Sequence, residues 1–96
     1  IVCAAAHVKV EEGLPTVVRL AVGGADQRPV RLHKAEHVLR GQLLNKDRVE
    51  HALQRSIDEL EPPSDYLGSA AYRRGMALVL ARRAVLGAWS KARQVS

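Results

Sequence analysis

The strongest constraint on the fold is a long apolar segment near the C-terminus, from Met76 to Trp89. Ser69 precedes this segment and is a good N-cap, because its hydroxyl can accept a backbone N–H of the first helical turn. On a helix that begins there, apolar side chains fall on nearly every face. The sequence therefore predicts a long helix that is buried against other elements.

The predicted helix can contact neighbours on more than one side. Its larger apolar side chains form two stripes and its alanines a third face: Tyr72, Val79 and Leu86; Leu78, Val85 and Trp89; and Ala77, Ala81, Ala84 and Ala88. The arginines of the helix are spread around its axis at intervals of about 80 to 100°. A DNA-binding stripe would need them on one side.

The 96 residues allow one domain, residues 1–96, with one modest core. Phenylalanine is absent, and the only aromatic residues are Tyr66, Tyr72 and Trp89, so the core must be aliphatic. Cys3 is alone, which excludes an intrachain disulfide, and its apolar surroundings predict a buried thiol. No signal peptide or membrane span is indicated. The chain opens at Ile1 without an initiator methionine, and we expect a fragment of a longer protein.

The first third of the chain alternates like β-strands. Apolar side chains occupy every second position from Val2 to Val10, and the alternation resumes from Thr16 to Val22 after a turn at residues 11–15. An antiparallel hairpin is predicted. A short third strand follows at Pro29–Leu32, with proline at its start.

Two shorter helices are predicted next. One covers His33 to Arg40, with Ala35, Val38 and Leu39 directed inward, and ends at Gly41. The other begins after Asn45 as N-cap, and its apolar side chains fall on one face: Val49, Leu53, Ile57 and Leu60. Together these elements predict an α+β fold, a small antiparallel sheet of three to four strands with three helices packed on one face.

No constellation in the sequence assigns catalytic roles. His33 and His37 are four residues apart, a spacing that can place two imidazoles on one metal, but no cysteine or acid completes a motif. Gly23-Gly24 would need further glycines and a helix directly behind it to cradle a phosphate, so a turn or bulge is the preferred interpretation. Capping and turn hydrogen bonds account for Ser64, Asp65 and Ser69. We therefore predict no catalytic, cofactor-binding or metal-binding residue in this chain.

Arg82 lies between the two apolar stripes of the long helix, where a buried guanidinium needs a partner. Acidic residues are concentrated in residues 47–65 and absent from residues 66–96. Asp58, Glu61 and Asp65 are the expected partners, and a surface outside this chain is the alternative.

The net charge of +5 raises the question of nucleic-acid binding. Against it, the arginines are dispersed, aromatic residues for base stacking are scarce and no recognised RNA- or DNA-binding signature is present. A free-standing basic binding module, for nucleic acid or a protein partner, is the alternative function.

The sequence resembles the C-terminal domain of the FAD-binding medium subunit of molybdenum hydroxylases, the carbon monoxide dehydrogenase and xanthine dehydrogenase family. The similarity runs from the first strand to about Leu86. The residues that carry it are Val18 to Ala25, Arg28 to Arg31, Ala35-Glu36, Leu39, Gly41, Ser64-Asp65, Gly68-Ser69, Tyr72-Arg73-Arg74, Val79-Leu80 and Arg82-Arg83-Ala84.

The resemblance implies an α+β domain of three or four antiparallel strands and three helices. It also implies a cytoplasmic oxidoreductase in which the medium subunit passes electrons from an iron–sulfur cluster through FAD to an acceptor. The molybdenum cofactor and the two-iron two-sulfur clusters belong to a large and a small partner subunit, and most FAD contacts belong to domains upstream of this one. No FAD, metal or catalytic residue is carried over to this chain, which alone is expected to be inactive.

We therefore expect a non-catalytic scaffold domain that packs against the upstream flavin-binding domains and helps to dock the partner subunits. This expectation rests on the long helix, whose apolar surface exceeds what a small sheet can cover. Its candidate interface residues are Tyr72, Arg73, Arg82 and Trp89.

Overall fold

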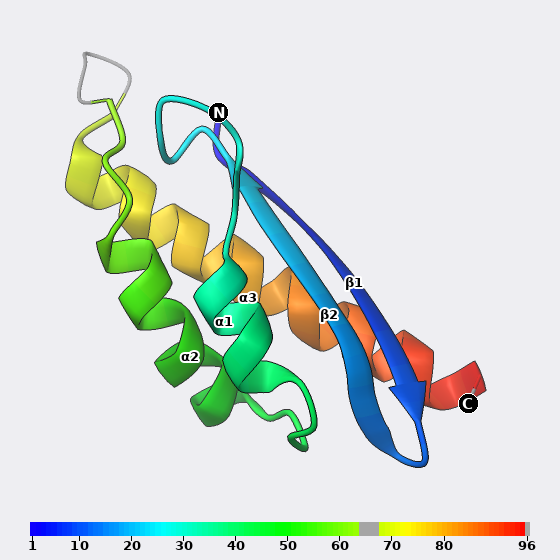
Figure 1. The fold of residues 1–96 in the computed structure, drawn as a ribbon. Coiled ribbons are helices and arrows are strands. Elements are labelled where there is room, and N and C mark those ends of the chain that lie inside the picture. The colour runs from blue at the N-terminus through cyan, green and yellow to red at the C-terminus, as the bar shows by residue number, and fades with distance from the viewer. Residues whose placement is uncertain (64–67, 96) are drawn as a thin grey trace.

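The computed structural model describes residues 1–63 and 68–95. In these residues two long strands, β1 (Cys3–Glu11) and β2 (Leu14–Gly23), precede a short strand, β3 (Val30–Arg31). Three helices follow: α1 (His33–Leu39), α2 (Lys46–Asp58) and α3 (Ala70–Val95). The strands form one antiparallel sheet in the order β1-β2-β3, and the helices lie on one side of it (Figure 1). The predicted α+β class is confirmed.

The β1–β2 hairpin follows the alternation in the sequence. Glu12 and Gly13 form the turn with φ of 53° and 79°, the positive values that two-residue hairpin loops require. On the inner face Val8 pairs with Val18, and on the outer face His7 pairs with Arg19. Residues 14 and 15, predicted as part of the turn, are the first residues of β2.

Cys3 corrects one prediction, because its thiol is exposed rather than buried. The even-numbered residues of β1 face the helices, so the odd-numbered residues point to the open face of the sheet. Cys3 lies on this open face, where it is paired with Gly23 of β2, and Ala5 lies on the same face two residues further along β1.

The two short helices begin and end where local chemistry places them. Asn45 Oδ1 accepts the backbone N–H of Arg48 at 2.8 Å and caps α2, as predicted. Gly41 follows α1 with φ of 76° and donates its N–H to the carbonyl of Pro15 at 2.8 Å. Val38, predicted to face inward, is 52% exposed, and Glu36 is buried in its place. The buried side of α1 is the side that lies against β2 and α2.

Helix α3 packs against β1 and α2 through one stripe that combines residues of the predicted alanine face with residues of one predicted apolar stripe (Figure 1). Ser69 Oγ accepts the N–H of Tyr72 at 3.0 Å, which confirms the N-cap. The buried residues recur every fourth position: Arg73, Ala77, Ala81, Val85 and Trp89. Small side chains at the middle of this stripe let the helix approach the sheet closely, whereas Tyr72 is 59% exposed.

The core fills the space between the sheet and the helices. Its largest members, all but excluded from solvent, are Leu20 and Val22 of β2, Leu39 of α1, Val49, Leu53 and Ile57 of α2, and Val85 of α3. Trp89 of α3, 4% exposed, adds the one aromatic ring to the core of the described residues, whose other members are aliphatic as expected from composition. Among the described helices, none has the length and apolarity that a membrane crossing needs.

Candidate functional site

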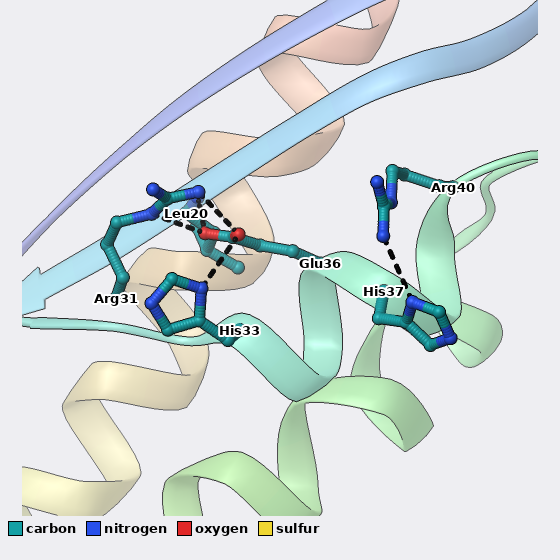
Figure 2. Close-up of polar contacts among 6 residues, drawn as sticks. All are labelled: Leu20, Arg31, His33, Glu36, His37 and Arg40. Carbon is teal, nitrogen blue, oxygen red and sulfur yellow. Dashed lines mark hydrogen bonds and ion pairs between the residues drawn. The ribbon is translucent and has the colours of Figure 1, made fainter.

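The most elaborate polar arrangement in the described residues is built around Glu36 of α1 (Figure 2). Its side chain is 7% exposed. Arg31 of β3 forms a bidentate ion pair with this carboxylate, with Nη2 2.7 Å from Oε1 and Nε 3.1 Å from Oε2. The backbone N–H of Leu20 donates to Oε2 at 2.8 Å, and His33 Nδ1 lies 3.6 Å from Oε1. One carboxylate thus joins β2, β3 and α1.

The carboxylate of Glu36 satisfies a backbone N–H group at the edge of the sheet. Strand β3 pairs with β2 only at Ala21–Arg31 and Val22–Val30, and the N–H of Leu32 reaches the carbonyl of Leu20 at 2.8 Å. The chain then turns into α1, so the N–H of Leu20 has no strand partner on that side. A buried backbone N–H without an acceptor is costly. Glu36 supplies the acceptor and closes this edge.

The surroundings of the Arg31–Glu36 pair favour the charged form of both side chains. Burial alone would raise the pKa of Glu36, but the hydrogen bonds from Arg31 and from the N–H of Leu20, with the charges of Arg31 and His33, lower this pKa below its ordinary value. The hydrogen bond to Glu36 raises the pKa of Arg31. The arrangement is a clamp between two charged groups.

A second clamp joins the N-terminal end of α3 to the loop after β2. Arg73, 8% exposed, donates from Nη1 to the carbonyl of Gly24 at 3.2 Å. Gly24 has a φ of 79°, and a Cβ there would lie 2.0 Å from the carbonyl oxygen of Ile1. Glycine at this position therefore serves the close approach of the chain's own backbone, which fits the predicted turn or bulge.

The partner of Arg82 differs from all three that were predicted. Arg82 Nη1 forms an ion pair with Glu50 Oε1 of α2, on side chains that are 21% and 35% exposed. Asp58 bonds instead to Gln54 in its own helix, at 2.8 Å. Glu50 lies earlier in α2 than the expected acids because α3 runs back along that helix, so Arg82 reaches its middle. Ser64 and Asp65 lie outside the described residues.

The four candidate interface residues have different surroundings. Tyr72 is 59% exposed and remains available to another surface. Arg73 and Trp89 are covered by the chain itself, at 8% and 4% exposed, and Arg93 lies over the Trp89 ring at 5.2 Å from its centroid. Arg82 is engaged with Glu50. The structure thus brings three of the four into internal contacts and leaves Tyr72 the most exposed, and the interface role of all four stays a prediction.

His33, His37 and His51 line one hollow between α1 and α2, and the first two engage protein groups. Arg40 Nη2 lies 3.0 Å from His37 Nδ1, and since a guanidinium only donates, this nitrogen must accept (Figure 2). His33 faces Glu36, and His51 lies on α2. Within residues 1–63 and 68–95, no three His, Cys, Asp or Glu side chains converge in a way that could hold a metal ion.

Sequence reasoning missed the Arg31–Glu36 pair, although both residues carry the resemblance. A signal was present, because Glu36 lies about 60° around the helix axis from Leu39, next to the apolar side of a short helix. A charged residue in that position needs a buried partner. The arginine of the preceding strand, five residues earlier, was within reach.

Comparisons with known proteins agree with this architecture. Over 74 residues, 77% of this chain, the sequence is 40% identical to the nicotine 6-hydroxylase medium subunit of Paenarthrobacter nicotinovorans. The structure superimposes on quinoline 2-oxidoreductase from Pseudomonas putida 86 with a TM-score of 0.89 and 28% identity over 95% of this chain. It superimposes on a Cu,Mo-CO dehydrogenase with a TM-score of 0.87 and 30% identity, again over 95% of this chain.

The matched region is a minor part of each relative. The chain spans 26% of the length of the nicotine 6-hydroxylase medium subunit and 32% of each of the two structural neighbours. The model of the CO dehydrogenase flavoprotein C-terminal domain matches residues 1–88. This match takes in the hairpin, the two polar clamps and most of α3, and the chain therefore belongs to the CO dehydrogenase flavoprotein C-terminal domain family.

Proposed function

We propose that this chain is the C-terminal scaffold domain of the FAD-binding medium subunit of a molybdenum hydroxylase. The family assignment and a relative that is named a medium subunit support it. The observation that carries the proposal is that the polar residues on which the resemblance rests are engaged within the domain itself. Arg31, Glu36 and Arg73 bond to backbone or to one another inside the domain. Their chemistry holds the fold together.

The parent enzyme is then an oxidoreductase of several subunits. Its medium subunit passes electrons from an iron–sulfur cluster of the small subunit through FAD to an acceptor, and substrate is hydroxylated at the molybdenum cofactor of the large subunit. A redox cofactor supplies its own electron chemistry, and the surrounding protein positions it. The contribution of residues 1–96 is to support the domains that do so. We place this enzyme in the cytoplasm.

The residues of this chain do not fit the cofactors themselves. A two-iron two-sulfur cluster needs four protein ligands, usually cysteines, and Cys3 is the only cysteine. At Gly23-Gly24, the close approach of Gly24 to the chain's own backbone supports a structural turn over a phosphate site. FAD is therefore assigned to the upstream domains of the subunit, and the molybdenum and iron–sulfur centres to its partner subunits.

The open face of the sheet is the natural surface for the rest of the subunit to cover. Cys3 and Ala5 are exposed on β1, and Ala21 beside them on β2 is half-buried. Small apolar side chains at this end of the open face permit close packing of a neighbouring domain, whereas His7, Lys9 and Arg19 make the rest of the face polar. Tyr72, exposed at the start of α3, adds an aromatic contact of the kind enriched at interfaces.

The alternative is a free-standing basic module that binds nucleic acid or protein. Two of its arginines are already committed, Arg31 to Glu36 and Arg82 to Glu50. Neutralised in this way, they contribute little to a phosphate-binding surface. The alternative is therefore less well supported.

Cofactor binding tests the proposal when the whole subunit is compared with residues 1–96. We expect visible flavin absorbance to copurify with the whole subunit, whereas residues 1–96 retain no added FAD in equilibrium dialysis. FAD retention by residues 1–96 would contradict the assignment of the cofactor to other domains. Salt-dependent retention of residues 1–96 on DNA, without flavin in the whole subunit, would favour the basic module.

A further inference from the structure

A groove of about 580 Å³ lies between α1 and α2, helices that stand side by side in Figure 1. Its walls carry mostly basic and imidazole side chains: His33, Lys34 and His37 from α1, and His51 and Arg55 from α2. Val38 completes the lining on the α1 side. None of the side chains that line this groove is a carboxylate.

The charges of the groove are only partly neutralised. Lys34 pairs with Glu59 at 2.6 Å on the surface, and His33 faces the buried Glu36. For Arg55 and His51, both exposed, no ion pair or hydrogen bond from the side chain is found in the part of the chain that the structure describes. These two side chains stay available to an anionic group from outside.

The groove also has an apolar contact point. Val38 is 52% exposed, although the other apolar side chains of α1, Ala35 and Leu39, are fully buried. Val38 and His51 also line a neighbouring depression of about 630 Å³, so the two hollows meet at these residues. Leu43, 60% exposed, lies in the connection between the helices. Val38 therefore offers a docked partner an apolar contact beside the basic groups of the groove.

We propose that the α1–α2 groove docks an acidic surface of a neighbouring subunit of the same enzyme. An apolar side chain of that subunit contacts Val38, and carboxylates beside it pair with Arg55 and His51. The inference rests on the proposed function, which supplies the neighbouring subunit. Charge complementarity favours an acidic protein surface over a nucleic acid, because a phosphate backbone would need a stripe of unpaired lysines and arginines. Here Arg55 is the one arginine in the lining.

The test uses the full-length subunit that carries this chain, together with the other subunits of its enzyme. Val38→Asp and Arg55→Glu are made separately. Lys91→Glu, on the distant C-terminal part of α3, provides the same change in charge as Arg55→Glu. The affinity of each variant for the other subunits is measured by biolayer interferometry at low and at high salt. Because Val38 and Arg55 are exposed, both variants are expected to fold, and melting temperatures check this.

We expect Val38→Asp and Arg55→Glu each to weaken assembly by about tenfold, and Lys91→Glu to leave it unchanged. The loss in Arg55→Glu should shrink at high salt, because screening weakens the charge pairs that it removes. Equal affinity of all variants would overturn the groove inference and leave the proposed function standing. Failure of the unaltered subunit to assemble would overturn both. A loss of DNA retention in Arg55→Glu, with assembly unchanged, would identify the groove as a nucleic-acid site and refute the inference.

Discussion

Glu36 joins three elements through one carboxylate, since it accepts hydrogen bonds from Leu20 of β2 and Arg31 of β3 while its own backbone belongs to α1. Glu36→Ala leaves the buried N–H of Leu20 without an acceptor, and we expect a loss of about 1–3 kcal/mol in the free energy of unfolding. Glu59→Ala is the matched control, because it removes an exposed carboxylate from Lys34 and should cost about 0–1 kcal/mol. Chemical denaturation measures both, and equal losses would show that Glu36 does not act as a clamp.

The charge of Glu36 also predicts how stability depends on pH. Its pKa is lowered in the folded chain, because the hydrogen bonds and charges around it outweigh burial. The folded state therefore holds its proton less tightly than the unfolded state, and the pair contributes stability above the unfolded pKa, about 4.3. This contribution is lost as the pH falls from there through the folded pKa. In urea titrations from pH 7 to pH 3, the difference between the unaltered chain and Glu36→Gln should shrink as the solution becomes more acidic. A constant difference would mean that Glu36 does not titrate as assigned.

Gly24 is a residue where a side chain has no room. In Gly24→Ala the new Cβ would meet the backbone of Ile1 at 2.0 Å, so residues 1 and 2 must move away. Gly41→Ala shares the positive φ but has nothing within 4 Å of its Cβ. The left-handed conformation costs each alanine about 1 kcal/mol. We expect a clearly larger loss of melting temperature in Gly24→Ala, and equal losses in the two variants would argue against the close contact.

At the level of elements, local signals in the sequence predicted the hairpin, the third strand and all three helices. Asn45 and Ser69 mark helix starts through contacts within a few residues, and Gly41 marks a helix end through its positive φ, so all three can be identified without the fold. The start of β2 was predicted too late, at Thr16, because Leu14-Pro15 resembles a turn although the strand begins there. Caps and periodicity thus determined most of the element boundaries.

The buried side of α3 could not be predicted in the same way. A helix with apolar residues on nearly every face offers several packing surfaces, and only its neighbours decide between them. The stripe from Arg73 to Trp89 rotates by about 40° at each fourth residue, so different parts of one helix meet the Gly24 loop and β1. The same reason explains the missed ion pair of Arg82 with Glu50, which depends on where α2 lies. Glu36 was missed because a charged residue on a short helix usually faces solvent.

The close approach of α3 to the sheet predicts a strong size limit at Ala81. Its side chain is fully buried, so Ala81→Leu must displace neighbours and should cost about 1–3 kcal/mol of unfolding free energy. Ala71→Leu makes the same change at an exposed position of the same helix and should have little effect. Guanidinium denaturation compares the two. A tolerated leucine at residue 81 would show that the helix does not pack as closely as described.

At the scale of the whole molecule, the helices cover one face of the sheet and leave the other open (Figure 1). The extents of 46 × 21 × 20 Å give the domain an elongated form with much surface for its size. A neighbouring domain on the open face and an acidic subunit at the α1–α2 groove would lie on different sides of this body. Such an arrangement suits a domain that supports others in a larger enzyme.

Calorimetric titration of residues 1–96 into the remainder of the subunit that carries them tests this account most directly. We predict saturable association with one chain per truncated subunit, and a negative change in heat capacity from the apolar surface that becomes buried. Heat of dilution alone, with both pieces shown to be folded, would contradict the role of this chain as a supporting domain.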